Sequence, residues 1–324
     1  MKKIFVAGHN GMVGRAIVKK LEKIQNVQVL TIEKEKLNLL NQQKVKQFLS
    51  EHKPEEVYLA AAKVGGIQAN NDYPTEFLYE NLMIQNNVIY SAFESKIKKL
   101  LFLGSSCIYP KFSKQPISES ELLSGYLEPT NEPYAIAKIA GLKLCESLNR
   151  QYGADIGIDY RAVMPTNLYG EGDDYGNPDA AHVIPSLINK IHLSKINNKN
   201  SVELWGTGTP KREFLFSDDL ASACIFLMGI SKEKFRKSVG YPSCHVNVGY
   251  GQDIEISALA KMICKVIGYD GELKFDTTKP DGTPKKLLDS SIVNALGWKP
   301  KVSLEDGLMM AYTSFLNEFV DRKR

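Results

Sequence analysis

The feature that most constrains this chain is a glycine-rich turn near its N-terminus, in the stretch KIFVAGHNGMVG. A strand-like apolar run ends at Gly8 and a segment with helical periodicity begins near Met12, so Gly11 and Gly14 lie where a strand passes into a helix. Glycine allows the tight turn, the approach of a pyrophosphate to the backbone, and the close packing of helix on strand. Free N–H groups at the start of that helix favour phosphate. We therefore predict a dinucleotide-binding turn, with the spacing GxxGxxG in place of GxGxxG.

The alternation of strand-like and helical segments continues to about residue 170. Strands are expected within 3–8, 27–32, 55–62, 98–106 and 158–170, and helices within 12–24, 75–96 and 133–153. Short, continuously apolar strands between helices are typical of a parallel sheet covered on both faces. We therefore predict an α/β fold, a Rossmann-type doubly wound parallel sheet with a smaller C-terminal α/β lobe.

After residue 170 the sequence becomes richer in glycine, proline and charge. We interpret LWGTGTPKREFLF as a loop, and we expect later helices within 256–268 and 304–319. The predicted division is a nucleotide-binding domain over 1–170, joined again by a segment at about 213–250, and a lobe formed mainly by 171–324.

Composition and charge exclude several other classes of protein. The chain has 324 residues, 43% of them hydrophobic and 24% charged, as is typical of globular proteins. No apolar run is long enough for a membrane span or a secretory signal, so we predict no membrane contact. The net charge of +4 comes without a long basic block, so no nucleic-acid partner is predicted. Five scattered cysteines form no CxxC pair, which predicts no metal site and a reducing, cytoplasmic location.

The choice between NAD and NADP depends on the residues that follow the second expected strand, in VLTIEKEKLNLL. Glu33 favours a free ribose 2′-hydroxyl, whereas Lys34 and Lys36 favour a 2′-phosphate. The local sequence therefore leaves both cofactors open.

Tyr134 and Lys138 lie four residues apart in an expected helix, so they share one face. An ammonium beside a phenol stabilises the phenolate and lowers the pKa of the tyrosine from ~10 toward working pH. Such a tyrosine exchanges a proton with a substrate oxygen during hydride transfer. Ser105 ends an expected strand, where ligands bind in open α/β sheets, and can bond to the same oxygen. With the glycine turn, these residues predict a nicotinamide-dependent reductase.

Longer motifs point to one family within this class. They are AGHNGMVG, YLAAAKVGGI, FLGSSCIYP, EPTNEPYAIAKIAGLKLCES, VMPTNLYG, HVIP, REFLFSDDLA and KPDGTPKKLLD. With these motifs the chain resembles the GDP-L-fucose synthase family of extended short-chain dehydrogenases/reductases over almost its whole length. The resemblance implies a bifunctional enzyme that uses NADP(H), epimerises C3 and C5 of GDP-4-keto-6-deoxy-D-mannose, and reduces C4. It also implies that the C-terminal lobe binds the GDP-sugar.

The resemblance assigns roles to individual residues. It implies that Ser105, Tyr134 and Lys138 form the reductase triad, and that Cys107 and His182 are the base and acid of epimerisation. Cofactor contacts are implied for Gly8, Asn10, Gly11, Met12, Val13, Gly14, Lys34, Leu39, Ala61, Lys138 and His182. Contacts to the GDP-sugar are implied for Ser106, Cys107, Asn167, Lys190, Trp205, Arg212 and Lys286.

Two departures from the family pattern leave alternatives open. Asn10 stands where the family commonly has an arginine for the 2′-phosphate, so NAD(H) is not excluded. The loop YGEGDDYGNPDAAHV differs from the family's usual wording, which suggests a related substrate. The alternative is a C4 reductase of a GDP-4-keto-6-deoxy-heptose in capsule polysaccharide biosynthesis, with another enzyme performing the epimerisation.

Other possibilities are disfavoured by the same residues. Sugar-nucleotide 4,6-dehydratases of this superfamily have an Asp–Glu pair where this chain has Ser106 and Cys107. A dinucleotide-sensing regulatory protein commonly lacks the tyrosine or the lysine that this chain retains. The resemblance further implies a homodimer, for which the helices at 75–96 and 133–153 are the candidate interface.

Overall fold

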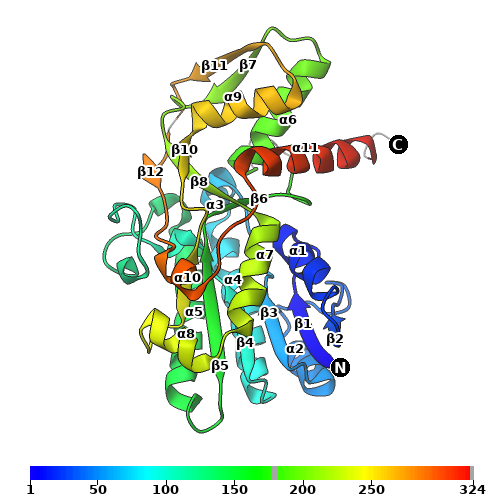
Figure 1. Ribbon diagram of the computed structural model, residues 1–324, viewed down its shortest axis with the longest axis vertical. Coiled ribbons are helices and arrows are strands. Elements are labelled where there is room, and N and C mark those ends of the chain that lie inside the picture. The colour runs from blue at the N-terminus through cyan, green and yellow to red at the C-terminus, as the bar shows by residue number, and fades with distance from the viewer. Residues whose placement is uncertain (177–180, 280, 322–324) are drawn as a thin grey trace.

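A six-stranded parallel sheet forms the larger part of the protein (Figure 1). The computed structural model describes residues 1–176, 181–279 and 281–321. The sheet has the order β2-β1-β3-β4-β5-β9, and its strands are β1 (Lys2–Ala7), β2 (Val27–Leu30), β3 (Glu56–Leu59), β4 (Lys99–Leu103), β5 (Asp159–Pro165) and β9 (His245–Val248). The strand order reverses at β1, which places a topological switch point at the carboxyl ends of β1 and β3, where ligands bind in such sheets.

Helices cover both faces of this sheet. Alternate residues along each strand point to opposite faces, so each strand contributes to two hydrophobic cores. Ile4 and Val6 of β1 lie in one core, and Phe5 and Ala7 lie in the other. The first core includes α1 (Met12–Leu21), α7 (Ser217–Gly229), α8 (Lys232–Val239) and α10 (Ser291–Leu296). The second includes α2 (Gln42–His52), α4 (Pro74–Glu94) and α5 (Glu132–Tyr152).

Short elements follow the strands at the carboxyl edge of the sheet. Helix α3 (Ile67–Asp72) lies between β3 and α4, and three 3₁₀ turns, η1 (Ser106–Ile108), η2 (Glu119–Glu121) and η3 (Pro129–Asn131), lie between β4 and α5. These turns bring the LGSSCIYP stretch and the start of α5 to the same edge.

A smaller lobe lies beyond this edge (Figure 1). Its first sheet joins β6 (Asn167–Tyr169), β8 (Lys211–Phe216), β10 (Asp253–Glu255) and β12 (Lys285–Lys286), and its second joins β7 (Ser201–Trp205) and β11 (Glu272–Asp276). A third hydrophobic core includes α6 (Val183–Ile196), α9 (Ile256–Ile267) and α11 (Leu304–Asp321). Between these segments the chain returns to the large sheet through α7 and β9.

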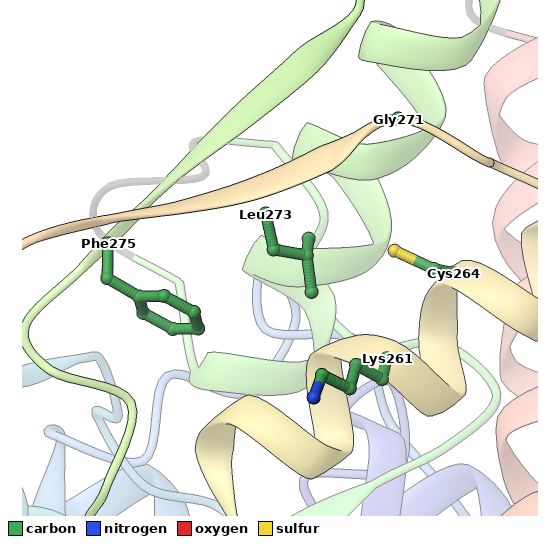
Figure 2. Close-up of a pocket in the computed structure, with 5 residues that line it drawn as sticks. All are labelled: Lys261, Cys264, Gly271, Leu273 and Phe275. Atoms are coloured by element: carbon green, nitrogen blue, oxygen red, sulfur yellow. The ribbon is translucent and has the colours of Figure 1, made fainter.

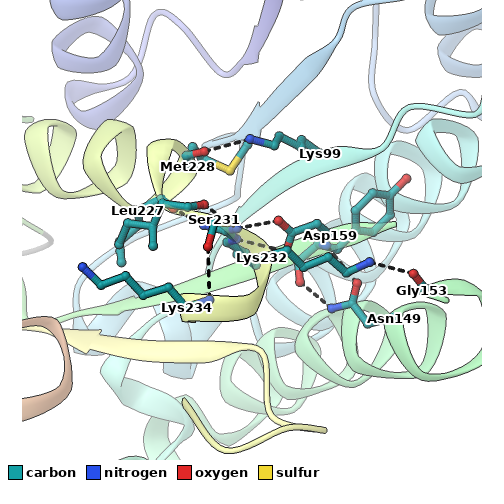
Figure 3. A network of polar contacts seen from close by, with 12 residues as sticks. Lys99, Asn149, Gly153, Asp159, Leu227, Met228, Ser231, Lys232 and Lys234 are labelled. Atoms are coloured by element: carbon teal, nitrogen blue, oxygen red, sulfur yellow. Dashed lines mark hydrogen bonds and ion pairs between the residues drawn. The ribbon is translucent and has the colours of Figure 1, made fainter. Parts of the chain in front are cut away.

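A buried ion pair within β5 is bonded to the end of α7. Arg161 Nε donates to Asp159 Oδ1 at 3.0 Å, and the same guanidinium donates to the carbonyls of Leu227 and Ile230. Lys99 of β4 donates to the Met228 carbonyl in the same network (Figure 3). The network satisfies the last carbonyls of α7, which have no partner within the helix.

The predicted α/β class and Rossmann-type sheet are confirmed, and each expected helix appears within three residues of its predicted limits. One expectation was wrong: LWGTGTPKREFLF is not a loop, since it holds the end of β7 and all of β8. Strand β8 is stabilised by pairing with β6 and β10, and the end of β7 by pairing with β11, all of them distant in sequence. No helix among the described residues is long and apolar enough to cross a membrane.

Candidate functional site

The glycine turn has the geometry of a phosphate cradle. Gly8 adopts φ +88°, and a Cβ on Gly14 would lie 2.0 Å from the Gly8 carbonyl oxygen, so only glycine fits at both positions. Gly11 precedes α1 without a side-chain cap, which leaves the first N–H groups of α1 for a ligand. A Cβ on Gly8 would also lie 2.5 Å from the nitrogen of Ala61, after β3. These residues, with Met12 and Val13 in the first turn of α1, fit a dinucleotide pyrophosphate.

The residues that follow β2 close one side of this turn. Asn10 Nδ2 donates to Glu33 Oε2 at 2.7 Å, and His9 Nε2 lies 3.2 Å from Glu33 Oε1. These bonds lower the pKa of the Glu33 carboxyl, so it is charged at neutral pH. Lys34 is exposed on the same loop, whereas Leu39 packs against the core and its carbonyl accepts a bond from Asn87.

Ser105 and Tyr134 meet at the carboxyl end of β4. Ser105 lies two residues after the end of β4 and Tyr134 lies in the first turn of α5, and their hydroxyls are hydrogen-bonded. Lys138 lies one turn further along α5 with its ammonium 5.8 Å from the centre of the Tyr134 ring. The structure therefore brings the three predicted residues together.

Burial governs the electrostatics of this group. It lowers the pKa of Lys138 to about 7, since Lys138 is only 3% exposed. The ammonium donates to the Leu103 carbonyl at 2.8 Å. It also raises the pKa of Tyr134, an effect that the hydrogen bond from Ser105 partly offsets. The expected lowering of the tyrosine pKa by Lys138 is not found, because the ammonium points to a carbonyl and desolvation dominates.

Cys107 lies beside this group with two donors on its sulfur. Asn131 Nδ2 donates to Cys107 Sγ at 3.5 Å, and Lys286 Nζ of β12 donates to it at 3.7 Å. The backbone N–H of Cys107 donates to Ser105 Oγ at 3.2 Å, which ties the thiol to the triad. Sequence reasoning missed Asn131, although it lies three residues before Tyr134 in the motif EPTNEPYA.

Of the other predicted substrate residues, Ser106 is buried and Asn167 is hydrogen-bonded to the backbone. Ser106 is 3% exposed in η1, while Asn167 Nδ2 donates to the Glu213 carbonyl at 2.9 Å. His182 is exposed directly before α6, where partial desolvation lowers its pKa. The structure shows no contact between His182 and Cys107, and residues 177–180 of the preceding loop lie outside the described residues.

The remaining predicted substrate residues, Lys190, Trp205 and Arg212, lie on elements of the smaller lobe. Lys190 of α6 lies 5.1 Å from the centre of the Trp205 ring, which is 44% exposed. Arg212 of β8 is partly buried, which lowers the pKa of its guanidinium while Asp281 opposes that shift. An exposed indole with cations around it suits a nucleotide base and its phosphates.

A separate hollow of about 470 Å³ lies between α9 and β11. Figure 2 shows the residues that line it, which are Lys261, Cys264, Gly271, Leu273 and Phe275. None of them is a predicted site residue, and only Lys261 is charged. The chemistry described above is therefore not located in this hollow.

Comparisons with known proteins agree with this geometry. Residues 4–249 match the NAD dependent epimerase/dehydratase family. GDP-L-fucose synthase of Escherichia coli (strain K12) is 52% identical over 323 residues, which cover 100% of this chain and 99% of that protein. A GDP-6-OMe-4-keto-L-xylo-heptose reductase from C. jejuni has a TM-score of 0.88 at 37% identity, with 98% of each chain covered. A GDP-mannoheptose C4 reductase from Campylobacter jejuni with NADP bound has a TM-score of 0.83 at 39% identity, covering 97% of this chain and 98% of that one.

The strand order is that of a Rossmann-type sheet, and the identity to the E. coli synthase extends over the whole chain. The chain belongs to the NAD dependent epimerase/dehydratase family and, within it, to the GDP-L-fucose synthases.

Proposed function

We propose that this protein epimerises C3 and C5 of GDP-4-keto-6-deoxy-D-mannose and reduces C4 with NADPH, giving GDP-L-fucose. The observation that carries the proposal is the meeting of a reductase triad and a hydrogen-bonded thiol at one strand end. The E. coli synthase, at 52% identity, supports the choice of substrate, and the NADP-bound reductase supports the choice of cofactor.

The residues of the triad have separate tasks in the reduction. A bound nicotinamide supplies the hydride that is transferred to C4. Tyr134 is a protonated phenol at neutral pH and donates its proton to the oxygen at C4 as negative charge develops there. Ser105 donates to the same oxygen and orients it, and Lys138 supplies a further donor on the same helix face.

The thiol performs the carbon-acid step before reduction. The 4-keto group acidifies the hydrogens at C3 and C5, so the Cys107 thiolate takes a proton from carbon and the electron pair forms an enolate. The enolate carbon then accepts a proton from His182 on the other ring face, which inverts the centre. Asn131 and Lys286 orient the sulfur through their bonds to Sγ.

Two variants test the proposal. Tyr134→Phe is expected to lower NADPH oxidation by about 10²-fold or more, because the proton donor is lost. Cys107→Ser is expected to abolish deuterium uptake from D₂O at C3 and C5. Tyr126→Phe, at a 95% exposed tyrosine, and Cys264→Ser, in the separate hollow, are the matched controls. Full activity of Tyr134→Phe would refute the assignment.

The heptose alternative remains a prediction. Two Campylobacter heptose reductases have similar structures, but at 37–39% identity against 52% for the E. coli synthase. Turnover of GDP-4-keto-6-deoxy-D-mannose and of a GDP-4-keto-heptose, with products identified by NMR, separates the two. Reduction of the heptose without deuterium uptake would favour the alternative.

We infer a homodimer that uses the paired helices α4 and α5. These helices pack against each other and expose three large apolar side chains, Tyr79, Tyr90 and Ile136. Exposed aromatic residues on adjacent helices are typical of an interface. Light scattering after gel filtration tests this, and Tyr79→Lys is expected to give a monomer.

A further inference from the structure

The loop after β2 places opposite charges beside the phosphate cradle. Both carboxylate oxygens of Glu33 are held by residues between Gly8 and Gly11: Asn10 bonds to one, and His9 lies within reach of the other. Each carboxylate oxygen accepts more than one hydrogen bond, so Glu33 keeps lone pairs for a ligand. Its side chain is 53% exposed despite these contacts. Glu33 is therefore a fixed anion that solvent and ligands can reach.

The location of Glu33 indicates which part of a cofactor it meets. Strand β2 pairs in parallel with β1, with Leu30 opposite Phe5, so the residues after both strands lie side by side. In this fold an acidic residue about 20 positions beyond the glycine turn bonds to the ribose 2′-hydroxyl of NAD, and a cation there accommodates the 2′-phosphate of NADP. Glu33 is an acidic residue in the position that suits NAD, and the exposed Lys34 and Lys36 on the same loop are cations that suit NADP.

We propose that Glu33 is the residue that sets cofactor choice in this chain, and that it makes the enzyme accept NADH as well as NADPH. The carboxylate accepts hydrogen bonds from the ribose hydroxyls of NADH and repels the 2′-phosphate of NADPH, while Lys34 and Lys36 compensate that repulsion. The inference rests on the proposed function only in requiring that the glycine turn hold a nicotinamide dinucleotide.

Cofactor binding without sugar tests the inference. The dissociation constants of NADH and NADPH are measured by titration calorimetry for the wild type, Glu33→Gln, and Glu35→Gln as a matched control. Glu35 is an exposed carboxylate two residues away, so its variant has the same net charge. We expect the wild type to bind the two cofactors within about tenfold of each other. Glu33→Gln should tighten NADPH by about tenfold, since a like charge is removed, and weaken NADH by a similar factor, since a charge-assisted bond is lost.

The outcomes separate the two proposals. A ratio of the two constants that shifts about 100-fold in Glu33→Gln and not in Glu35→Gln supports the inference. A ratio that is unchanged in Glu33→Gln, or a wild type that binds only NADPH, overturns it and leaves the proposed function standing. A wild type that binds neither cofactor overturns both. Thermal unfolding of each variant verifies that the exposed substitutions leave the fold intact.

Discussion

Replacing the buried Lys138 by methionine should make the stability of the protein less dependent on pH. Burial lowers the pKa of this lysine from 10.5 to about 7, so the unfolded chain keeps the proton at pH values where the folded protein has lost it. Between pH 7 and pH 10 the unfolded state therefore binds more protons, and the stability of the wild type rises with pH. Below about pH 7 both states are protonated, and the folded state has the full desolvation cost.

The size of the effect follows from that shift. One pKa unit corresponds to about 1.4 kcal/mol, so the Lys138 contribution to the free energy of unfolding should rise by about 3 kcal/mol between pH 7 and pH 10. Methionine has a similar length and no charge, so Lys138→Met lacks this rise. The excess in free energy of unfolding of Lys138→Met over the wild type should therefore shrink by the same amount as the pH increases from 7 to 10.

Urea unfolding at several pH values between 7 and 10 measures this difference. Other groups titrate in the range, but they are common to both proteins and cancel in the comparison. Lys143→Met is the matched control, because Lys143 is on the same helix with a partly exposed side chain paired to Glu146. Parallel curves for the wild type and Lys138→Met would show that the ammonium is not destabilised, and would refute the argument.

Three further predictions concern stability, the cradle and the thiol. Asp159→Asn should lower the free energy of unfolding by about 3 kcal/mol in urea titrations, since it leaves the buried Arg161 without its charge partner; unchanged stability would contradict this. Gly14→Ala should weaken NADPH binding by about 10- to 100-fold in calorimetry, because the new methyl group meets the turn, whereas Gly229→Ala, with open space around it, should bind normally. Lys286→Met should slow alkylation of Cys107 by iodoacetamide at pH 7 by about fivefold, because the ammonium near Sγ is lost; equal rates would exclude a role for Lys286 in thiol reactivity.

Those parts of the fold and site that depend on local pattern were predictable. The strand, turn and helix around Gly8 follow from periodicity and from glycine spacing, and both are local properties of the sequence. The shared face of Tyr134 and Lys138 follows from helix geometry alone. Even so, the pKa shifts of these two residues were not predictable, because they depend on how completely the surrounding core excludes water.

Features made by residues distant in sequence were not predictable from pattern. The bond from Lys286 to Cys107 joins positions 179 residues apart, and it exists because β12 pairs with β8 at the edge near η1. The local pattern of β8 indicates a loop because its stabilising partners, β6 and β10, are also distant in sequence. The sequence shows that Glu33 and its neighbouring lysines favour different cofactors. It does not show the contacts of Glu33 with His9 and Asn10.

The burial that destabilises the lysine also suits the direction of the chemistry. A reductase needs its tyrosine protonated before hydride transfer, and burial raises the pKa of Tyr134, which keeps the phenol in that state. The hydrogen bond with Ser105 partly offsets this rise in the pKa of Tyr134. The phenol therefore keeps its proton at neutral pH and can still donate it. Because the N–H of Cys107 donates to the same serine oxygen, Cys107 and Tyr134, the base and the acid of the proposed mechanism, are linked through Ser105. Both can then serve one sugar ring without rearrangement of the loop between β4 and α5.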